Sequence, residues 1–101
     1  MPSLSIISWR DIPAQVVVKR GRETAKVQLS ARFQEAVDRA AMRAGKGTSD
    51  AYLADWKRSE GRPCGEDIQA EAAAEAARIE ARFSDSALEA LIRSKGLAAG
   101  P

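Results

Sequence analysis

The chain of 101 residues contains no histidine and a single cysteine, Cys64. Without histidine it has no imidazole to ligate a metal, to act as a general base or to complete a Ser-His-Asp triad. One cysteine cannot form an internal disulfide, and nothing in its use indicates an oxidising compartment. Cys64 follows a proline and has no histidine to activate it, so we expect a structural or incidental thiol.

Long apolar runs are also missing. No basic N-terminal region leads into an apolar segment of signal-peptide length, and no run approaches the length that spans a bilayer. We therefore expect a cytoplasmic protein. Aromatic residues make up only 5% of the chain, and much of its 45% apolar content is alanine. This composition predicts a thin core and marginal or partner-dependent stability.

The sequence contains few motifs that are typical of catalytic sites. Residues 45–48 (GKGT) lack both the spacing of a phosphate-binding P-loop and a preceding strand. Glu71 and Glu75 lie four residues apart on a predicted helix, where we expect them to be solvated rather than to act as acid and base. Asp11, next to Arg10, is expected to cap a turn or to form a local ion pair. We predict no catalytic activity and no cofactor or metal bound by this chain alone.

The charge is unevenly distributed along the chain. Residues 1–32 carry six basic and two acidic side chains, whereas residues 33–101 carry ten basic and twelve acidic ones. Such an asymmetry attracts an anionic partner to the basic end. Solubilising charge on exposed strands and turns accounts for it equally well, and the sequence leaves both interpretations open.

The first thirty residues predict a β-meander. They are rich in β-branched residues, and residues 25–29 alternate apolar and polar side chains as in a half-buried strand. Pro13 in the first connection and Gly21 in the second mark the two turns. The predicted strands cover residues 3–9, 14–19 and 24–29.

Helical periodicity dominates the remainder of the chain. The expected N-caps are Ser30 for the first helix and Thr48 or Ser49 for the second. Gly45 and Gly47 are expected to end the first helix. Ser86 and Glu89 fit a capping box for the last helix, which is expected to stop at Gly96. The predicted helices cover residues 31–44, 50–59, 66–83 and 87–95. We thus expect a single α+β domain over residues 1–101, with the helices on one face of the sheet and a frayed tail at residues 97–101.

Residues 9–22 concentrate side chains that folding alone does not require. Tryptophan and arginine are enriched in binding hot spots, and arginines in turns are harder to bury than a tryptophan at a strand end. We predict a partner- or anion-binding surface with Trp9 as its desolvated anchor, although core burial is the other role open to Trp9. Its arginines would pair with carboxylates or an anionic ligand. The predicted residues are Trp9, Arg10, Asp11, Gln15, Arg20, Arg22 and, from the first helix, Arg43.

Nucleic-acid binding is the alternative hypothesis. A basic cluster offers phosphate contacts, and Trp9 beside it offers a stacking surface. The net charge of only +2, the single aromatic near the cluster and the lack of a known binding motif argue against it. The basic cluster comprises Lys19, Arg20, Arg22 and Lys26.

The string WRDIPAQV at residues 9–16, followed by Gly21-Arg22, resembles the opening of a small bacterial family labelled "virulence factor" proteins. Further similarities are AAMR at residues 40–43, the predicted helix from Asp50 to Trp56, and the alanine-rich run at residues 71–77. The resemblance covers nearly the whole chain.

Members of this family are often encoded beside enzymes of folate-linked one-carbon metabolism, including methylenetetrahydrofolate reductase-like and corrinoid methyltransferase-like proteins. The resemblance therefore implies an accessory subunit of such an enzyme, in contact with the folate or the flavin or nucleotide ligand of its partner. It offers no catalytic residues to carry over to this chain.

Overall fold

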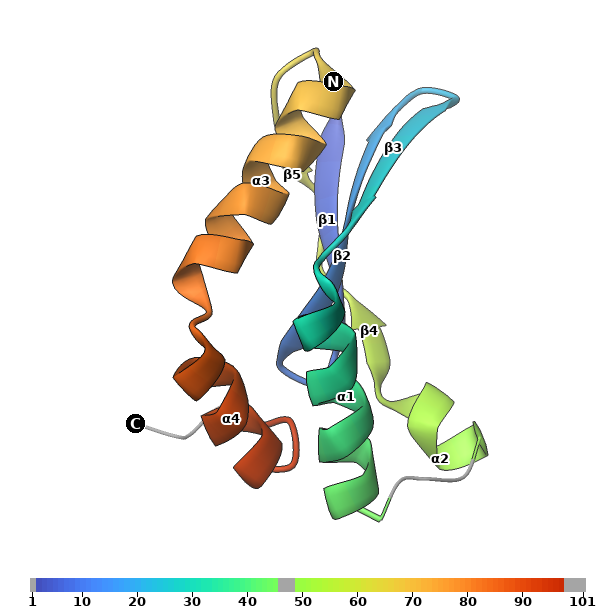
Figure 1. Cartoon of the computed structure of the whole chain (residues 1–101). Helices are drawn as coiled ribbons and strands as arrows, with labels where there is room; N and C mark the ends of the chain where they lie inside the picture. Colours follow the sequence, from blue (N-terminus) through green and yellow to red (C-terminus); the bar gives the residue numbers. More distant parts are fainter. Residues whose placement is uncertain (1, 46–48, 98–101) are drawn as a thin grey trace.

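The computed structural model describes residues 2–45 and 49–97, which form an antiparallel sheet and a set of helices (Figure 1). The strands are β1 (Ser3–Trp9), β2 (Ile12–Arg20), β3 (Glu23–Gln28), β4 (Trp56–Arg58) and β5 (Arg62–Pro63). The helices are α1 (Ala31–Arg43), α2 (Ser49–Ala54), α3 (Ile68–Arg82) and α4 (Asp85–Arg93). The predicted α+β class and the leading meander are confirmed. The expected roles of Gly47 and Thr48 at helix ends, and the tail from residue 98, lie outside the described residues.

The sheet has the strand order β3-β2-β1-β4, with β5 paired to the other end of β1. Strand β2 is longer than predicted and includes Pro13. A bulge allows this, because Ile7 pairs with Gln15 while Ser8 pairs with Pro13, which leaves Ala14 as an extra residue. The proline thus lies at an irregularity of the ladder rather than in the turn.

The helix predicted over residues 50–59 is wrong beyond Ala54. Tyr52 and Trp56 have helical spacing, but Trp56 pairs with Trp9 and begins strand β4. The backbone carbonyl of Asp55 accepts a hydrogen bond from the Arg10 amide at 3.1 Å, which ends the helix and turns the chain toward β1. Pairing with a strand more than forty residues away outweighs the local periodicity here.

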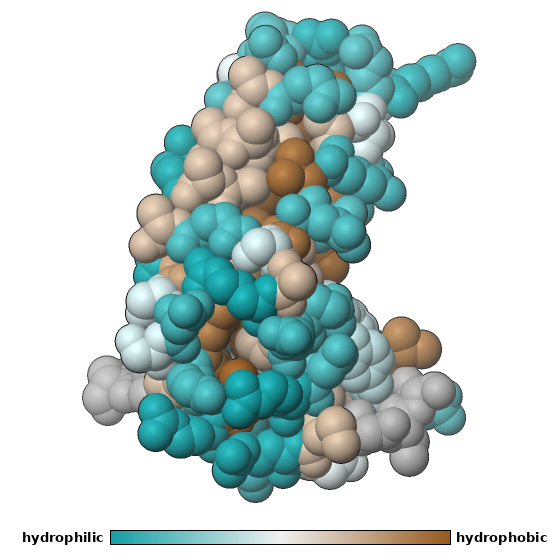
Figure 2. Space-filling model, viewed as in Figure 1, coloured by the Kyte–Doolittle hydropathy of each residue, from teal (hydrophilic) through white to brown (hydrophobic). Residues whose placement is uncertain are grey.

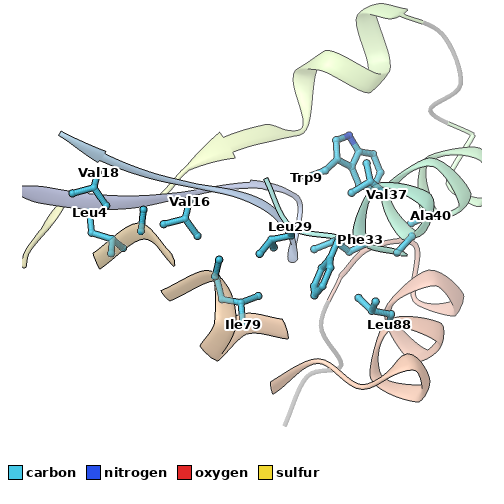
Figure 3. Packing of buried hydrophobic residues seen from close by; sticks show 14 of the residues in the cluster. Leu4, Trp9, Val16, Val18, Leu29, Phe33, Val37, Ala40, Ile79 and Leu88 are labelled. Atoms are coloured by element: carbon cyan, nitrogen blue, oxygen red, sulfur yellow. The ribbon is translucent and has the colours of Figure 1, made fainter. Parts of the chain in front are cut away.

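Helix α3 covers one face of the sheet. That face carries Leu4, Val16, Val18 and Ala25, all at most 2% exposed. Because α3 presents alanines, the helix approaches the strands closely, and Ile79 fills the remaining space (Figure 3). The residues of α3 in this contact are Ile68, Ala72, Ala76 and Ile79.

A second part of the core lies where α1 and α4 pack on each other at the end of β1. Trp9, Phe33 and Val37 are fully buried there, and Leu88 and Ile92 approach them from α4 (Figure 3). Phe33 meets Phe83 edge to face with ring centroids 5.9 Å apart. The large side chains in this part of the core thus compensate for the small apolar surface that the alanines of α3 bury in the other part.

Glu75 lies inside the contact between α3 and the sheet, which corrects the expectation that it is solvated. Its side chain is 5% exposed, and Oε1 accepts hydrogen bonds from Arg62 at 2.8 Å and from Arg78 at 2.7 Å. Glu71 instead accepts a hydrogen bond from the amide of Gly65 at 2.6 Å. Glu75 therefore stabilises the fold through its two arginines, because burying a carboxylate is costly unless it is paired, and half-buried Glu71 holds the segment before α3.

The helix caps differ in part from the prediction. The cap of α4 is Ser84, whose Oγ accepts from the Ala87 amide at 3.1 Å, and not Ser86. Ser30 does occupy the N-cap position of α1, but its side chain makes no cap hydrogen bond. Its Oγ donates instead to Oε1 of Glu80 on α3 at 2.9 Å. The Ser30 hydroxyl therefore joins two helices rather than closing one.

None of the helices in the described ranges has the length and apolar character that crossing a bilayer requires.

The left-handed residue that closes α4 is Lys95, at φ +62°, whose amide donates to the Ile92 carbonyl at 3.0 Å. The predicted stop, Gly96, follows it at φ +85° and is buried against Trp9. A Cβ at this position would lie 2.7 Å from Cζ3 of Trp9. We expect Gly96→Ala to lower the free energy of unfolding in urea by about 2–4 kcal/mol, because backbone strain and a clash in the core add together. Gly45→Ala is the matched control, since Gly45 has φ at +73° but open space around it, and should cost about 1 kcal/mol. Equal losses in the two variants would contradict this packing.

Glu80 links α3 to the start of α1. Its carboxylate accepts hydrogen bonds from the Ser30 amide at 2.6 Å and from Arg32 at 3.1 Å. Burial acts to raise the pKa of Glu80, but the hydrogen bonds from Ser30 and the charge of Arg32 outweigh it and lower that pKa below its ordinary value.

A carboxyl group whose pKa is lowered by folding stabilises the fold above its unfolded pKa of about 4.3, and this contribution is lost as the pH falls through the folded value. We expect Glu80→Gln to reduce stability at neutral pH and to weaken its decrease below about pH 5 in urea unfolding curves. Glu60→Gln, at an exposed residue that forms no ion pair within the described ranges, is the control and should keep the wild-type pH dependence. An unchanged pH dependence in Glu80→Gln would contradict the proposed linkage.

Candidate functional site

Trp9 lies in the core and is not available as the exposed anchor of a partner interface, which corrects that prediction. Its side chain is 0% exposed, and Nε1 donates to the backbone carbonyl of Tyr52 at 2.8 Å. The Tyr52 ring stacks on it with centroids 6.2 Å apart, and Trp56 meets Tyr52 edge to face. The indole therefore joins β1 to the α2–β4 segment, the second of the two roles that the sequence left open.

Arg10 is also held inside the molecule. Nε pairs with Asp55 at 3.2 Å, Nη1 donates to the Lys95 carbonyl at 2.8 Å, and the guanidinium lies 5.0 Å from the Trp9 ring. Asp11 pairs with Lys57 at 3.3 Å. Arg10 is thus partly buried and bonded to two distant segments of the chain, whereas the ion pair of Asp11 with Lys57 is partly exposed.

Arg20, on the α3 side of the sheet, is paired within the chain. It contacts Glu23 at 3.0 Å and Glu66 at 3.7 Å, and Nη1 donates to the Glu66 carbonyl at 2.6 Å. The hydrogen bond with Glu23, followed by the charge of Glu23, raises the pKa of Arg20 above its ordinary value. Arg20 thus fixes the β2–β3 hairpin to the N-terminal end of α3.

The opposite side of the hairpin carries cations without acidic partners. The strand register places three side chains each of β1, β2 and β3, together with Arg58 of β4, on the sheet face away from α3, which we call the open face. No strand residue on it is acidic within the described ranges. Arg22 adds an exposed cation at the turn beside this face. Arg22, Lys19 and Lys26 have no ion-pair partner among the described residues. The open face consists of Ser3, Ser5, Ile7, Gln15, Val17, Lys19, Thr24, Lys26, Gln28 and Arg58, of which Ser5 and Val17 are buried.

Gln15 lies in a groove of about 490 Å³ on this side of the molecule. Ile7, Gln15 and Gln28 form one cross-strand row along it, because each pairs with the next in the register. The Gln15 and Gln28 amides make no side-chain hydrogen bond to a described residue, so their donors and acceptors are free. We call this hollow the glutamine groove. Its lining consists of Ile7, Ala14, Gln15, Gln28, Leu29, Ala31, Gln34 and Trp56.

A second groove of about 320 Å³ lies between α1 and α4. Figure 2 shows apolar atoms at the floor of a hollow there, with hydrophilic side chains around it. Four of the five charged side chains that line it form ion pairs across the groove: Arg32 contacts Asp85 at 3.2 Å, and Arg39 contacts Glu89 at 3.2 Å, while Glu35 is the fifth. Since these charges are already neutralised, we regard this groove as a seam between packed helices.

The predicted site residues do not form one surface. Nine residues of β2 separate the Arg10 turn from the Gly21 turn, a distance of roughly 30 Å at 3.3 Å per residue. Arg43 lies at the C-terminal end of α1, far from the β2–β3 hairpin (Figure 1). Of the predicted set, Gln15 and Arg22 thus lie on or next to the open face, whereas Arg43 is exposed elsewhere.

A comparison with models of protein families identifies the family of this chain. Residues 7–92 match the family model described as "Virulence factor". The chain belongs to the virulence factor family. The resemblance carried by WRDIPAQV and the later segments is thereby confirmed. No curated protein and no solved structure matches the chain.

The Cys64 thiol and the acidic side chains are the groups of this virulence factor family member that bear on nucleophilic chemistry and metal binding. Burial, and then the negative charge of Glu71, raise the pKa of the Cys64 thiol, which keeps it in the unreactive protonated form. Within the described ranges, no cluster of three or more acidic or cysteine side chains is arranged to hold a metal ion. The arrangement is suited to recognition by charge and by hydrogen bonds.

Sequence reasoning missed Gln28, Gln34 and Arg58 as candidate site residues. The alternation over residues 25–29 does place Gln28 opposite the apolar positions of its strand. Its alignment with Gln15 needed the register, and Arg58 was assigned to a helix. The sequence pattern could therefore have indicated Gln28 as an exposed strand residue, but neither its alignment with Gln15 nor the position of Arg58 in a strand.

The two tryptophans of this family member differ in exposure, which gives a direct test. We expect the Trp56→Phe variant, in which only buried Trp9 emits, to be quenched by acrylamide at least about threefold less than the wild type. Circular dichroism should show that the variant is folded, and both proteins should be quenched alike in urea. Quenching of folded Trp56→Phe at the wild-type level would show that Trp9 is accessible and would overturn its assignment to the core.

Proposed function

We propose that this protein is a non-catalytic interaction subunit that binds a larger, anionic partner protein through the open face and the adjoining Arg22 turn. The observation that carries the proposal is the asymmetry of the hairpin. On the α3 side Arg20 is neutralised by Glu23 and Glu66, whereas Lys19, Lys26 and Arg22 have no acidic partner in the described part of the chain. Unpaired cations on one face attract an anionic surface and orient its approach.

The glutamine groove supplies the specific part of this surface. Two free amides above an apolar floor of Ile7, Leu29 and Trp56 combine hydrogen bonding with a place to bury an apolar group. Such a combination selects one partner among many anionic ones, because a badly placed polar group leaves the amides unsatisfied. The cations would thus attract the partner protein, and the groove would determine which partner binds.

The first partner to test is a methylenetetrahydrofolate reductase-like enzyme, as the family resemblance implies for an accessory subunit of one-carbon metabolism. In that assembly this chain would bring no cofactor and no catalytic group. Its open face would lie against the enzyme, near the folate or the flavin or nucleotide ligand. The burial of Trp9 favours this proposal over nucleic-acid binding, since it removes the stacking ring on which that alternative depended.

The test is a charge reversal with a matched control. The triple variant Lys19→Glu, Arg22→Glu, Lys26→Glu should retain at least about tenfold less of the purified reductase-like enzyme than the wild type in a pull-down. The control reverses Arg43, Arg82 and Arg93, which are exposed on the helices and give the same change in net charge. It should retain partner within about twofold of the wild type.

Equal losses in both triple variants would indicate unspecific charge attraction and would contradict the proposed interface. Binding of RNA or DNA at low salt, with affinity falling steeply as salt is added, would support the nucleic-acid alternative instead.

A further inference from the structure

Strand β3 is an edge of the sheet, and its pairing with β2 shows which of its backbone amides and carbonyls point away from the sheet. The Leu29 amide donates to the Ala14 carbonyl at 3.0 Å, next to the register pair of Gln28 and Gln15. In an antiparallel ladder such a pair is of the non-hydrogen-bonded type, and the type alternates along the strand. The amide and carbonyl groups of Thr24, Lys26 and Gln28 therefore point away from β2, toward the open edge.

No described segment satisfies these groups. The amides of Thr24, Lys26 and Gln28 donate no hydrogen bond within the described residues. The other edge of the sheet is different, because β4 and β5 are short and Ser59 bonds to both the amide and the carbonyl of Ile6. An uncovered edge of six residues is a template for a further strand.

Pairing between two copies of β3 is disfavoured by charge. Lys26 is the middle one of the three outward-facing residues, so an antiparallel pair of β3 strands would bring two Lys26 side chains together, with Lys19 nearby on each copy. A lysine on an edge strand is a common protection against self-association. The same lysines attract a strand of opposite charge.

We propose that β3 accepts an extended acidic segment of a partner protein as a further antiparallel strand. The added strand would exchange hydrogen bonds with Thr24, Lys26 and Gln28. Its acidic side chains would lie on the open face opposite Lys26, and small or apolar ones on the side of Ala25 and Val27. A side chain opposite Gln28 would lie at the mouth of the glutamine groove. This inference rests on the proposed function, for which it specifies the chemical class and conformation of the partner.

Amide hydrogen exchange by NMR tests the proposal with a defined probe. The probe is a blocked seven-residue peptide in which glutamate alternates with valine or threonine, added up to millimolar concentration to the full chain. We expect exchange at Thr24, Lys26 and Gln28 to slow by at least about tenfold, while Ala25 and Val27, already bonded to β2, change by less than about twofold. A peptide with lysine in place of glutamate should give no protection.

Two variants of Lys26 separate the hydrogen bond from the charge. Lys26→Pro removes both the charge and an amide that bonds to no strand of the sheet, so the sheet should still form. The loss of protection by the acidic peptide should be complete in Lys26→Pro, and its excess over the loss in Lys26→Gln is the effect of the amide. Lys26→Gln keeps the amide and should weaken acidic-peptide binding about threefold to tenfold. The circular dichroism of both variants should match that of the wild type.

Unchanged exchange at the three outward amides with the acidic peptide, or equal protection by the lysine peptide, would overturn strand addition. If the reductase-like enzyme is retained in the pull-down while these amides exchange at the free rate in the complex, the proposed function stands and the edge is not its interface. Protection of the three amides without retention of that enzyme would support the edge site and contradict the choice of partner.

Discussion

The β1–β2 turn is held between two distant parts of the chain, and the rest of the fold depends on this contact. The Arg10 amide bonds to the Asp55 carbonyl and the Asp11 amide to the Gly96 carbonyl, at 3.1 and 2.8 Å. Arg10 adopts a positive φ of 52°, a conformation that costs a non-glycine residue about 1–3 kcal/mol. The ion pair with Asp55 and the packing on Trp9 offset this cost.

This contact determines how the helices are arranged. It turns the chain after α2 into β4, and it fixes the end of α4 beneath the indole, where only glycine fits at position 96. Helix α1 then packs between that end and the sheet, with Phe33 and Val37 against Trp9. A few large side chains at one end of the sheet thus compensate for the thin, alanine-based contact of α3, which itself depends on the buried ion pairs of Glu75.

One end of the molecule therefore has its polar groups paired within the chain, and the other end is the surface that we propose for recognition. Around Arg10 the polar groups are paired within the chain, whereas on the open face and along β3 they are not. Strand edges and unpaired lysines bring little stability to a single chain. Their cost is low here because α3 already covers the other face of the hairpin and Arg20 holds it in place.

The sequence by itself determined the α+β class, the meander, the start of α1 and the presence of α4 before Gly96, because these depend on local periodicity and on the conformational freedom of glycine at turns. It also indicated the family through the string around Trp9. Only the tertiary structure decided that Trp56 begins a strand, that Trp9 and Arg10 serve the core, and that Glu75 is buried. The physical reason is that pairing and burial between residues far apart in the chain outweigh local propensity, and a sequence pattern does not specify which distant partner a side chain meets.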